Sequence, residues 1–195
     1  MYNVGIFLFN DVELLDYAGP YEVFSVTAQL NDQKLFKVFT LSEDGAAVRS
    51  VNGLTALSDF GFDNHPPIDI LVVPGGIGTR VAYKNDAVLD WLKSVAAGAQ
   101  IVMSVCSGAR ILGAVGLLDG QEAVTHHSVA DHLRETAPGA IVVDEKRYTD
   151  NGKVMTSGGI SAGIDLSLHI VTKLYGQEIA NKTVKYMEYG DWRSL

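Results

Sequence analysis

The chain has 195 residues, 47% of them hydrophobic and 19% charged, with a formal net charge of −8. These values exclude a disordered chain, and the length suits one well-buried domain, which we expect to span residues 1–195. The negative charge excludes a basic surface for nucleic acid or anionic lipid, so we expect neither a nucleic-acid partner nor a membrane. A single cysteine and the lack of a signal-peptide pattern at the start predict a soluble, cytoplasmic protein.

Apolar runs alternate with amphipathic runs in the first half of the chain, which predicts alternating strands and helices. The expected strands are 4–9, 36–41, 68–73 and 101–105, and the expected helices are 11–30 and 86–97. We expect Gly19-Pro20 to break the first helix, because proline lacks the amide hydrogen that a helix interior uses. Asn52-Gly53 predicts a tight turn between two short strands within 48–57.

The second half continues the alternation. The expected helices are 106–115 (ended by Gly116), 128–135, 161–175 and 177–187, and the expected strands are 122–125, 141–143 and 154–156, the last two flanking a turn at 150–152. Near-continuous apolar strands separated by helices predict a doubly wound α/β domain of flavodoxin-like type, with a mostly parallel sheet and helices on both faces. In such sheets the active site lies beyond the carboxyl ends of the strands.

Cys106, the only cysteine, stands between the apolar run 101–105 and a helix-like run that begins with the small residues Ser107 and Gly108. This order is typical of a nucleophile elbow, a sharp strand-to-helix turn that presents a reactive side chain at the end of a sheet. We expect the amides and dipole of the following helix to favour the thiolate. A lone cysteine can also be a small buried hydrophobe, but this context favours a functional thiol.

Asp16 lies between apolar residues, where an acid usually needs a partner or a task. It is either a catalytic acid or a carboxylate that a helix start stabilises. Gly76 ends the run Pro74-Gly75-Gly76 behind an expected strand, and no Lys-Ser/Thr pair follows to bind nucleotide phosphates. Its amide could join the Ser107 amide in stabilising an oxyanion, or the glycines could simply form a tight turn.

The histidines show no metal-ligand spacing. His126 and His127 follow the expected strand 122–125 and could approach the end of the sheet that carries Cys106, but adjacent residues point in different directions and do not suit one shared metal ion. We expect His132 on a helix surface and His169 in a helix core. No metal and no cofactor are therefore expected.

Together these segments resemble the ThiJ/PfpI superfamily, which has a class I glutamine amidotransferase-like fold. The resemblance spans almost the whole chain and rests on residues 15–24, 72–76, 104–109, 125–126 and 157–165. These segments are most similar to the isocyanide (isonitrile) hydratase branch, and equally to the amidase-like sensor domain of certain AraC-type regulators. Ser107 is a departure, since the hydratases carry threonine there, whereas PfpI-type peptidases carry histidine. The deglycase branch usually has glutamate in place of Asp16.

The resemblance implies a cysteine-dependent enzyme that adds water to a small isocyanide and releases an N-substituted formamide. Cys106 would attack the terminal carbon and Asp16 would act as general acid. Ser107 and Gly76 would supply amides for developing charge, and the resemblance also implies His126 and Ile160 as substrate-binding residues. Because a thiolate and a carboxylate in contact repel, Cys106 and Asp16 should titrate as a coupled unit. The resemblance further implies a homodimer.

Two alternatives stay open. One is a glyoxalase-like or deglycase-like enzyme for 2-oxoaldehydes, with His126 in its pocket. The other is a non-catalytic module that senses a ligand or, through oxidation of Cys106, the redox state. DNA binding by this chain itself is not expected, because it is acidic and ends at Leu195 without a helix-turn-helix domain.

Overall fold

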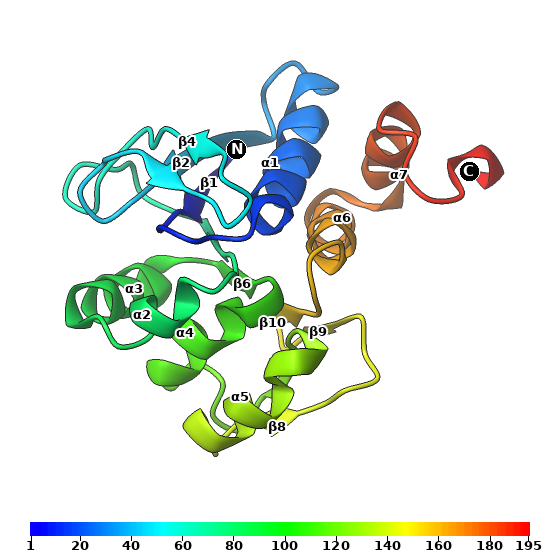
Figure 1. The fold of residues 1–195 in the computed structure, drawn as a ribbon. Coiled ribbons are helices and arrows are strands. Elements are labelled where there is room, and N and C mark those ends of the chain that lie inside the picture. Colours follow the sequence, from blue (N-terminus) through cyan, green and yellow to red (C-terminus); the bar gives the residue numbers. More distant parts are fainter.

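The computed structural model describes residues 1–195, in which strands and helices alternate along the chain (Figure 1). The strands are β1 (Tyr2–Phe7), β2 (Phe36–Leu41), β3 (Val48–Arg49), β4 (Thr55–Ala56), β5 (Ile70–Val73), β6 (Ile101–Ser104), β7 (Glu122–Ala123), β8 (Ile141–Val142), β9 (Tyr148–Asp150) and β10 (Val154–Ser157). The α-helices are α1 (Leu14–Gln29), α2 (Thr79–Ala82), α3 (Asp86–Gly98), α4 (Ala109–Ala114), α5 (Ala130–Thr136), α6 (Ala162–Tyr175) and α7 (Gln177–Tyr186). Short 3-10 turns cover Cys106–Gly108, His127–Val129 and Trp192–Ser194.

The main sheet has six strands in the order β2-β1-β5-β6-β10-β9. The first five are parallel, and β9 pairs antiparallel with β10 at the edge. In chain order the parallel strands read 2-1-3-4-5, the arrangement of flavodoxin-like folds. The predicted doubly wound α/β fold is therefore confirmed, and the carboxyl ends of β1, β5 and β6 meet at one edge of the sheet.

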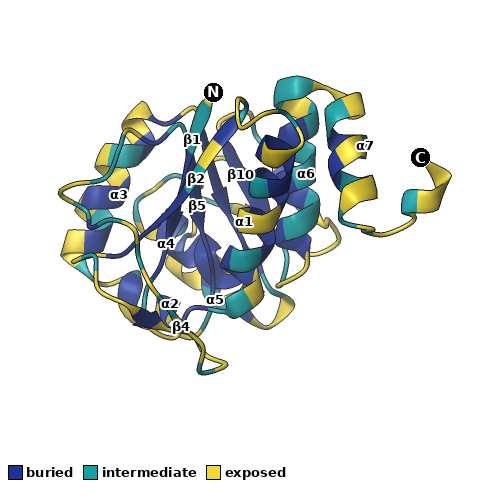
Figure 2. Cartoon of the chain, turned by 90° about the horizontal axis from the view of Figure 1, so that it is seen from above, coloured by how far each residue is buried: buried dark blue, intermediate teal, exposed yellow.

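Alternate residues of each strand enter two separate cores, one on each face of the sheet. In β5, Ile70 and Val72 belong to the core under α1 and α6, whereas Leu71 and Val73 belong to the core under α3, α4 and α5. Figure 2 shows the buried strands between these two helix layers, with α7 outside α6. No helix in the chain is both long enough and apolar enough to cross a bilayer.

The predicted break at Gly19-Pro20 is wrong, because α1 runs without interruption from Leu14 to Gln29 with Pro20 inside it. Both residues are buried against neighbouring elements. A Cβ added to Gly19 would lie 2.9 Å from Cγ1 of Ile164 in α6. Close packing of α1 on α6 therefore outweighs the hydrogen bond that proline removes.

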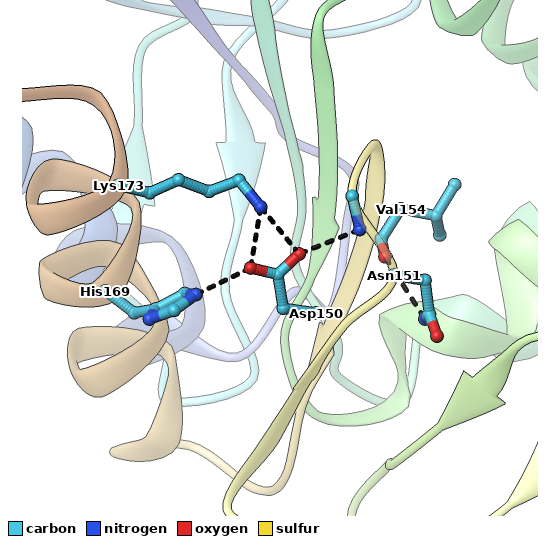
Figure 3. Close-up of polar contacts among 6 residues, drawn as sticks. Asp150, Asn151, Val154, His169 and Lys173 are labelled. Atoms are coloured by element: carbon cyan, nitrogen blue, oxygen red, sulfur yellow. Dashed lines mark hydrogen bonds and ion pairs between the residues drawn. The ribbon is translucent and has the colours of Figure 1, made fainter.

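The strand that precedes the turn at 150–152 and pairs with β10 is not the predicted one. The turn at 150–152 joins β9 to β10, whereas β8 pairs with β7 in a separate two-stranded sheet. The Asp150 carboxylate binds Nε2 of His169 at 2.8 Å and Nζ of Lys173 at 2.8 Å, both from α6 (Figure 3). The expected core position of His169 is thus wrong: its side chain is 29% exposed and tied to an acid, because this side of α6 faces the edge strand.

Candidate active site

Cys106 begins a 3-10 turn that one residue separates from the end of β6, and α4 follows as a helix of six residues. The predicted single helix over 106–115 is therefore split at the elbow. Cys106 has φ of +56°, a left-handed conformation that non-glycine residues seldom adopt. Its amide donates to the Gly158 carbonyl at 3.0 Å, and its carbonyl accepts from the Thr125 hydroxyl at 2.7 Å. These contacts hold the strained turn and the thiol in place.

Asp16 lies in the first turn of α1 and is fully buried. Its Oδ2 accepts a hydrogen bond from the Gly75 amide at 2.9 Å. The other oxygen, Oδ1, is buried without a hydrogen bond of normal geometry. The Cys106 thiol is nevertheless close enough for the two side chains to shift each other's pKa. Segments 90 residues apart in the chain thus bring an acid and a thiol together at the carboxyl end of the sheet.

Burial dominates the electrostatics of this pair. Desolvation raises the pKa of Asp16 to about 7, although the Gly75 amide opposes the shift. Burial, followed by repulsion from Asp16, raises the pKa of Cys106 to about 12, while the amides of Ile160 and Ser107 act in the opposite direction. The Ser107 amide at the helix start thus favours the thiolate, as expected, but desolvation outweighs it and the pKa of the thiol stays raised. Each of the two groups contributes to the shifted pKa of the other, so coupled titration stays our prediction for this pair.

The loop after β5 packs directly against the elbow. A Cβ on Gly75 would lie 2.5 Å from the Ser107 nitrogen and 2.8 Å from Oδ2 of Asp16, so only glycine fits between them. The Gly76 amide donates to the Ser107 hydroxyl at 3.0 Å. In this state Ser107 therefore occupies the Gly76 amide, which could serve an oxyanion only after this hydrogen bond opens.

His126 directly follows Thr125, and Ile160 lies two residues after Gly158, the two residues that hydrogen-bond to the Cys106 backbone. Ile160 has φ of +48°, and its amide interacts with the Cys106 sulfur while its side chain is 37% exposed. His126 packs on Gly159, one residue before Ile160, and its Nδ1 is 2.8 Å from the Ser128 hydroxyl. Burial and His127 lower the pKa of His126, which favours a neutral imidazole at this position.

A DJ-1/PfpI family model matches residues 2–173, most of the chain. The chain belongs to the DJ-1/PfpI family. Within this family it is 38% identical over 186 residues to an isonitrile hydratase of Pseudomonas putida, a match that covers 95% of this chain and 78% of the hydratase. It is also 29% identical over 178 residues to the HTH-type transcriptional regulator GbdR of Pseudomonas aeruginosa. That match covers 91% of this chain but only 48% of the regulator.

Solved structures of DJ-1/PfpI proteins agree with this membership. A ThiJ/PfpI family protein from Pseudomonas syringae superposes with a TM-score of 0.87 at 29% identity, covering 96% of this chain and 75% of that one. Drosophila melanogaster DJ-1beta shares the fold with a TM-score of 0.82 at 20% identity, covering 97% and 98% of the two chains. The resemblance seen in the sequence is therefore confirmed.

Three residues near the site of this DJ-1/PfpI protein were missed by sequence reasoning. Glu13 donates its amide to the Gly75 carbonyl at 2.9 Å, and its charge contributes to the raised pKa of Asp16. Thr79 and Arg110 are buried next to Ser107. The signal for Arg110 was a charged residue one helical turn after Cys106, within an otherwise apolar helix.

His132 also differs from its expected place on a helix surface. It is half-buried, and its Nδ1 accepts from Nε of Arg110 at 3.2 Å.

The arrangement as a whole offers a buried thiol, an adjacent carboxyl group that can exchange a proton with it, and backbone amides around the sulfur. These are the parts that nucleophilic catalysis with proton transfer requires.

Proposed function

We propose that this protein is a cysteine-dependent isocyanide hydratase. The observation that carries the proposal is the buried Asp16 carboxyl beside the Cys106 thiol, with a pKa raised to about 7. A group with this pKa can both accept and return a proton at neutral pH. The similarity to a protein named isonitrile hydratase supports the choice of reaction.

The proposed reaction begins with transfer of the thiol proton to the Asp16 carboxylate as sulfur bonds to the terminal carbon of R–N≡C. Asp16 then returns this proton to the same carbon, which gives the thioimidate Cys106–S–CH=N–R. Water adds to that carbon, one of its protons reaches nitrogen and the other returns to sulfur as the C–S bond breaks. The product is R–NH–CHO, and the sum is isocyanide plus water with no oxidant or reductant.

The burial of the thiol supports an isocyanide as substrate. Cys106 is only 7% exposed, so an attacked atom must reach a recessed sulfur. The isocyanide group is linear and ends in the reacting carbon, which lets it enter where a branched carbonyl meets more steric hindrance. The amides of Ser107 and Ile160, which interact with the sulfur, are placed to stabilise negative charge during attack.

A second candidate function is ligand sensing without turnover. The observation that favours it is the similarity to the regulator GbdR across most of this chain. The chain spans about half the length of that regulator. In this case the site would bind a small molecule, and the protonated thiol of Cys106 would serve as a contact rather than as a nucleophile.

The deciding experiment incubates the purified protein in parallel with an aryl isocyanide and with methylglyoxal, and follows formamide and lactate by mass spectrometry. We expect formamide from the native protein and none from Cys106→Ser, because an alcohol is a far weaker nucleophile than a thiol. Circular dichroism of the variant checks that the fold is intact. Equal turnover by Cys106→Ser would rule out the thiol mechanism. Lactate alone would favour the glyoxalase alternative, and saturable binding without either product would favour the sensor.

The proposal includes a homodimer. Four apolar side chains are exposed at the start of α1 and in or just after the β3–β4 hairpin, namely Leu15 (38% exposed), Val51 (46%), Leu54 (53%) and Leu57 (79%). The Val51 amide binds the Val12 carbonyl, which holds the hairpin beside α1. Burial of this apolar surface would favour self-association. Light scattering should give twice the mass of the chain, and a monomer would contradict the expectation.

A further inference from the structure

Arg110, the second residue of α4, is a buried cation without an acidic partner. Its side chain is 6% exposed, yet it forms no ion pair with any carboxylate. Its two hydrogen-bond acceptors are neutral: Oγ1 of Thr79 at 3.2 Å from Nη1, and Nδ1 of His132 at 3.2 Å from Nε. Burying a guanidinium is costly unless an anion compensates the charge.

The groups that face Arg110 add little negative charge. His132 of α5 must have an unprotonated Nδ1 to accept its hydrogen bond, so its imidazole is neutral. Arg80 of α2 is another cation, and with burial it lowers the pKa of Arg110. Tyr83 and Cys106 oppose this shift when they ionise. Of these two, only Cys106 belongs to the reactive site.

Thr79 connects Arg110 with that site. Its hydroxyl donates to the Gly76 carbonyl at 2.8 Å and lies 3.3 Å from Oγ of Ser107. Ser107 in turn accepts the Gly76 amide at 3.0 Å. The loop that these contacts hold also carries Gly75, whose amide binds Asp16. Through Thr79, Arg110 is thus linked by hydrogen bonds to the Gly75-Gly76 loop and to Ser107, which flank the Cys106–Asp16 pair, and its charge interacts with Cys106.

We propose that Arg110 is a positioning and charge-compensating residue that favours the thiolate of Cys106 with a protonated Asp16 over the thiol with an ionised Asp16. The first arrangement is the nucleophilic one. Arg110 lies one helical turn after Cys106 on the same elbow, so its charge favours the anion on sulfur. The inference rests on the proposed function only in taking Cys106 as the reactive group, and it can be tested without an isocyanide.

The test is the rate at which iodoacetamide alkylates Cys106 between pH 6 and 10. Because the chain has one cysteine, mass spectrometry of the intact protein reads this thiol alone. We expect Arg110→Gln and Arg110→Met to alkylate about tenfold more slowly at pH 7.5, with the rate profile displaced by about one pH unit to higher pH. Arg110→Lys, which keeps the charge, should stay within about threefold of the native rate.

Arg80→Gln is the matched control. It removes one positive charge from an exposed residue of α2, so it tests whether net charge alone alters the rate. We expect its profile to coincide with that of the native protein. Native-like profiles for both neutral Arg110 variants would overturn the proposal, as would an equal shift in Arg80→Gln. If one neutral variant does not fold by circular dichroism, the other and Arg110→Lys still decide.

Turnover separates this inference from the proposed function. If native protein hydrates no isocyanide but the neutral variants alkylate slowly, the hydratase proposal fails and the role of Arg110 stands. If native protein hydrates isocyanide and the neutral variants alkylate at the native rate, the hydratase proposal stands and the role proposed for Arg110 fails. If both proposals hold, the kcat of the neutral Arg110 variants should fall by about the same tenfold factor as their alkylation rate, with KM nearly unchanged.

Discussion

Two aspartates of this protein occupy opposite electrostatic environments. Asp16 is fully buried and receives one backbone hydrogen bond, from Gly75, and burial raises its pKa to about 7. Asp150 lies on the edge strand with its side chain 21% exposed (Figure 3). Burial also acts against its charge, but hydrogen bonds from His169, Lys173 and Gly152 prevail and lower its pKa to about 2.

The difference shows how surroundings assign a role to the same side chain. A carboxylate with a cationic partner stabilises the fold and stays ionised at neutral pH. A carboxyl group buried without a cation is disfavoured in its charged form, and it can exchange a proton at neutral pH. Asp16 therefore suits chemistry at some cost in stability, whereas Asp150 suits the anchoring of β9 to α6.

The largest expected effect is on turnover. Asp16→Asn should lower the rate of isocyanide hydration by about a hundredfold or more, because the amide cannot transfer the proton. Asp150→Asn makes the same chemical change far from the thiol and should leave the rate within about twofold of native. The measurement is kcat for both variants under identical conditions. Similar rates for the two would remove the assignment of Asp16 as the proton-transfer group.

The next effect is on the pH dependence of stability at Asp16. A raised pKa means that the favourable contribution of the protonated form is complete below pH 3.8 and is lost as pH rises through about 7. The side-chain amide introduced by Asp16→Asn is neutral at every pH, so this variant should gain stability relative to native protein, by about 4 kcal/mol between pH 4 and 8. Urea unfolding across this range measures the difference. If the free energies of unfolding of the variant and of native protein differed by the same amount from pH 4 to pH 8, Asp16 would be ionised over this whole pH range.

The smallest effect is on the stability that Asp150 provides. A lowered pKa means a contribution that is present above pH 3.8 and is lost as pH falls towards 2. Asp150→Asn should cost about 1 kcal/mol at pH 7, since solvent screens part of the ion pairs. Urea unfolding at pH 7 and pH 3 should show that the free energies of unfolding of native protein and of Asp150→Asn differ less at pH 3. A difference that grows on acidification would contradict this sign.

Much of the candidate site could be identified from local sequence. Cys106 was marked by the strand–Cys–Ser–Gly–helix pattern, and Asp16 by its apolar neighbours. Arg110 was overlooked although it sits one turn after the thiol, because its acceptors come from α2 and α5. The apolar residues around His169 predict a core position, but its partner Asp150 lies on β9, which the local sequence does not indicate.

Local sequence patterns are enough to predict the order of strands and helices, and from this order the doubly wound sheet and the edge at which Cys106 and Gly76 lie. These features follow from hydrophobic periodicity and from turn residues, which act over a few positions of the chain. Which of these groups carry charge depends instead on the folded arrangement. The pKa of Asp16 and of Cys106 depends on burial and on contacts between segments 90 residues apart, and no local pattern encodes the solvent that folding removes. For the same reason the amide at the helix start, which favours the thiolate as expected, does not prevent burial from raising the pKa of the Cys106 thiol.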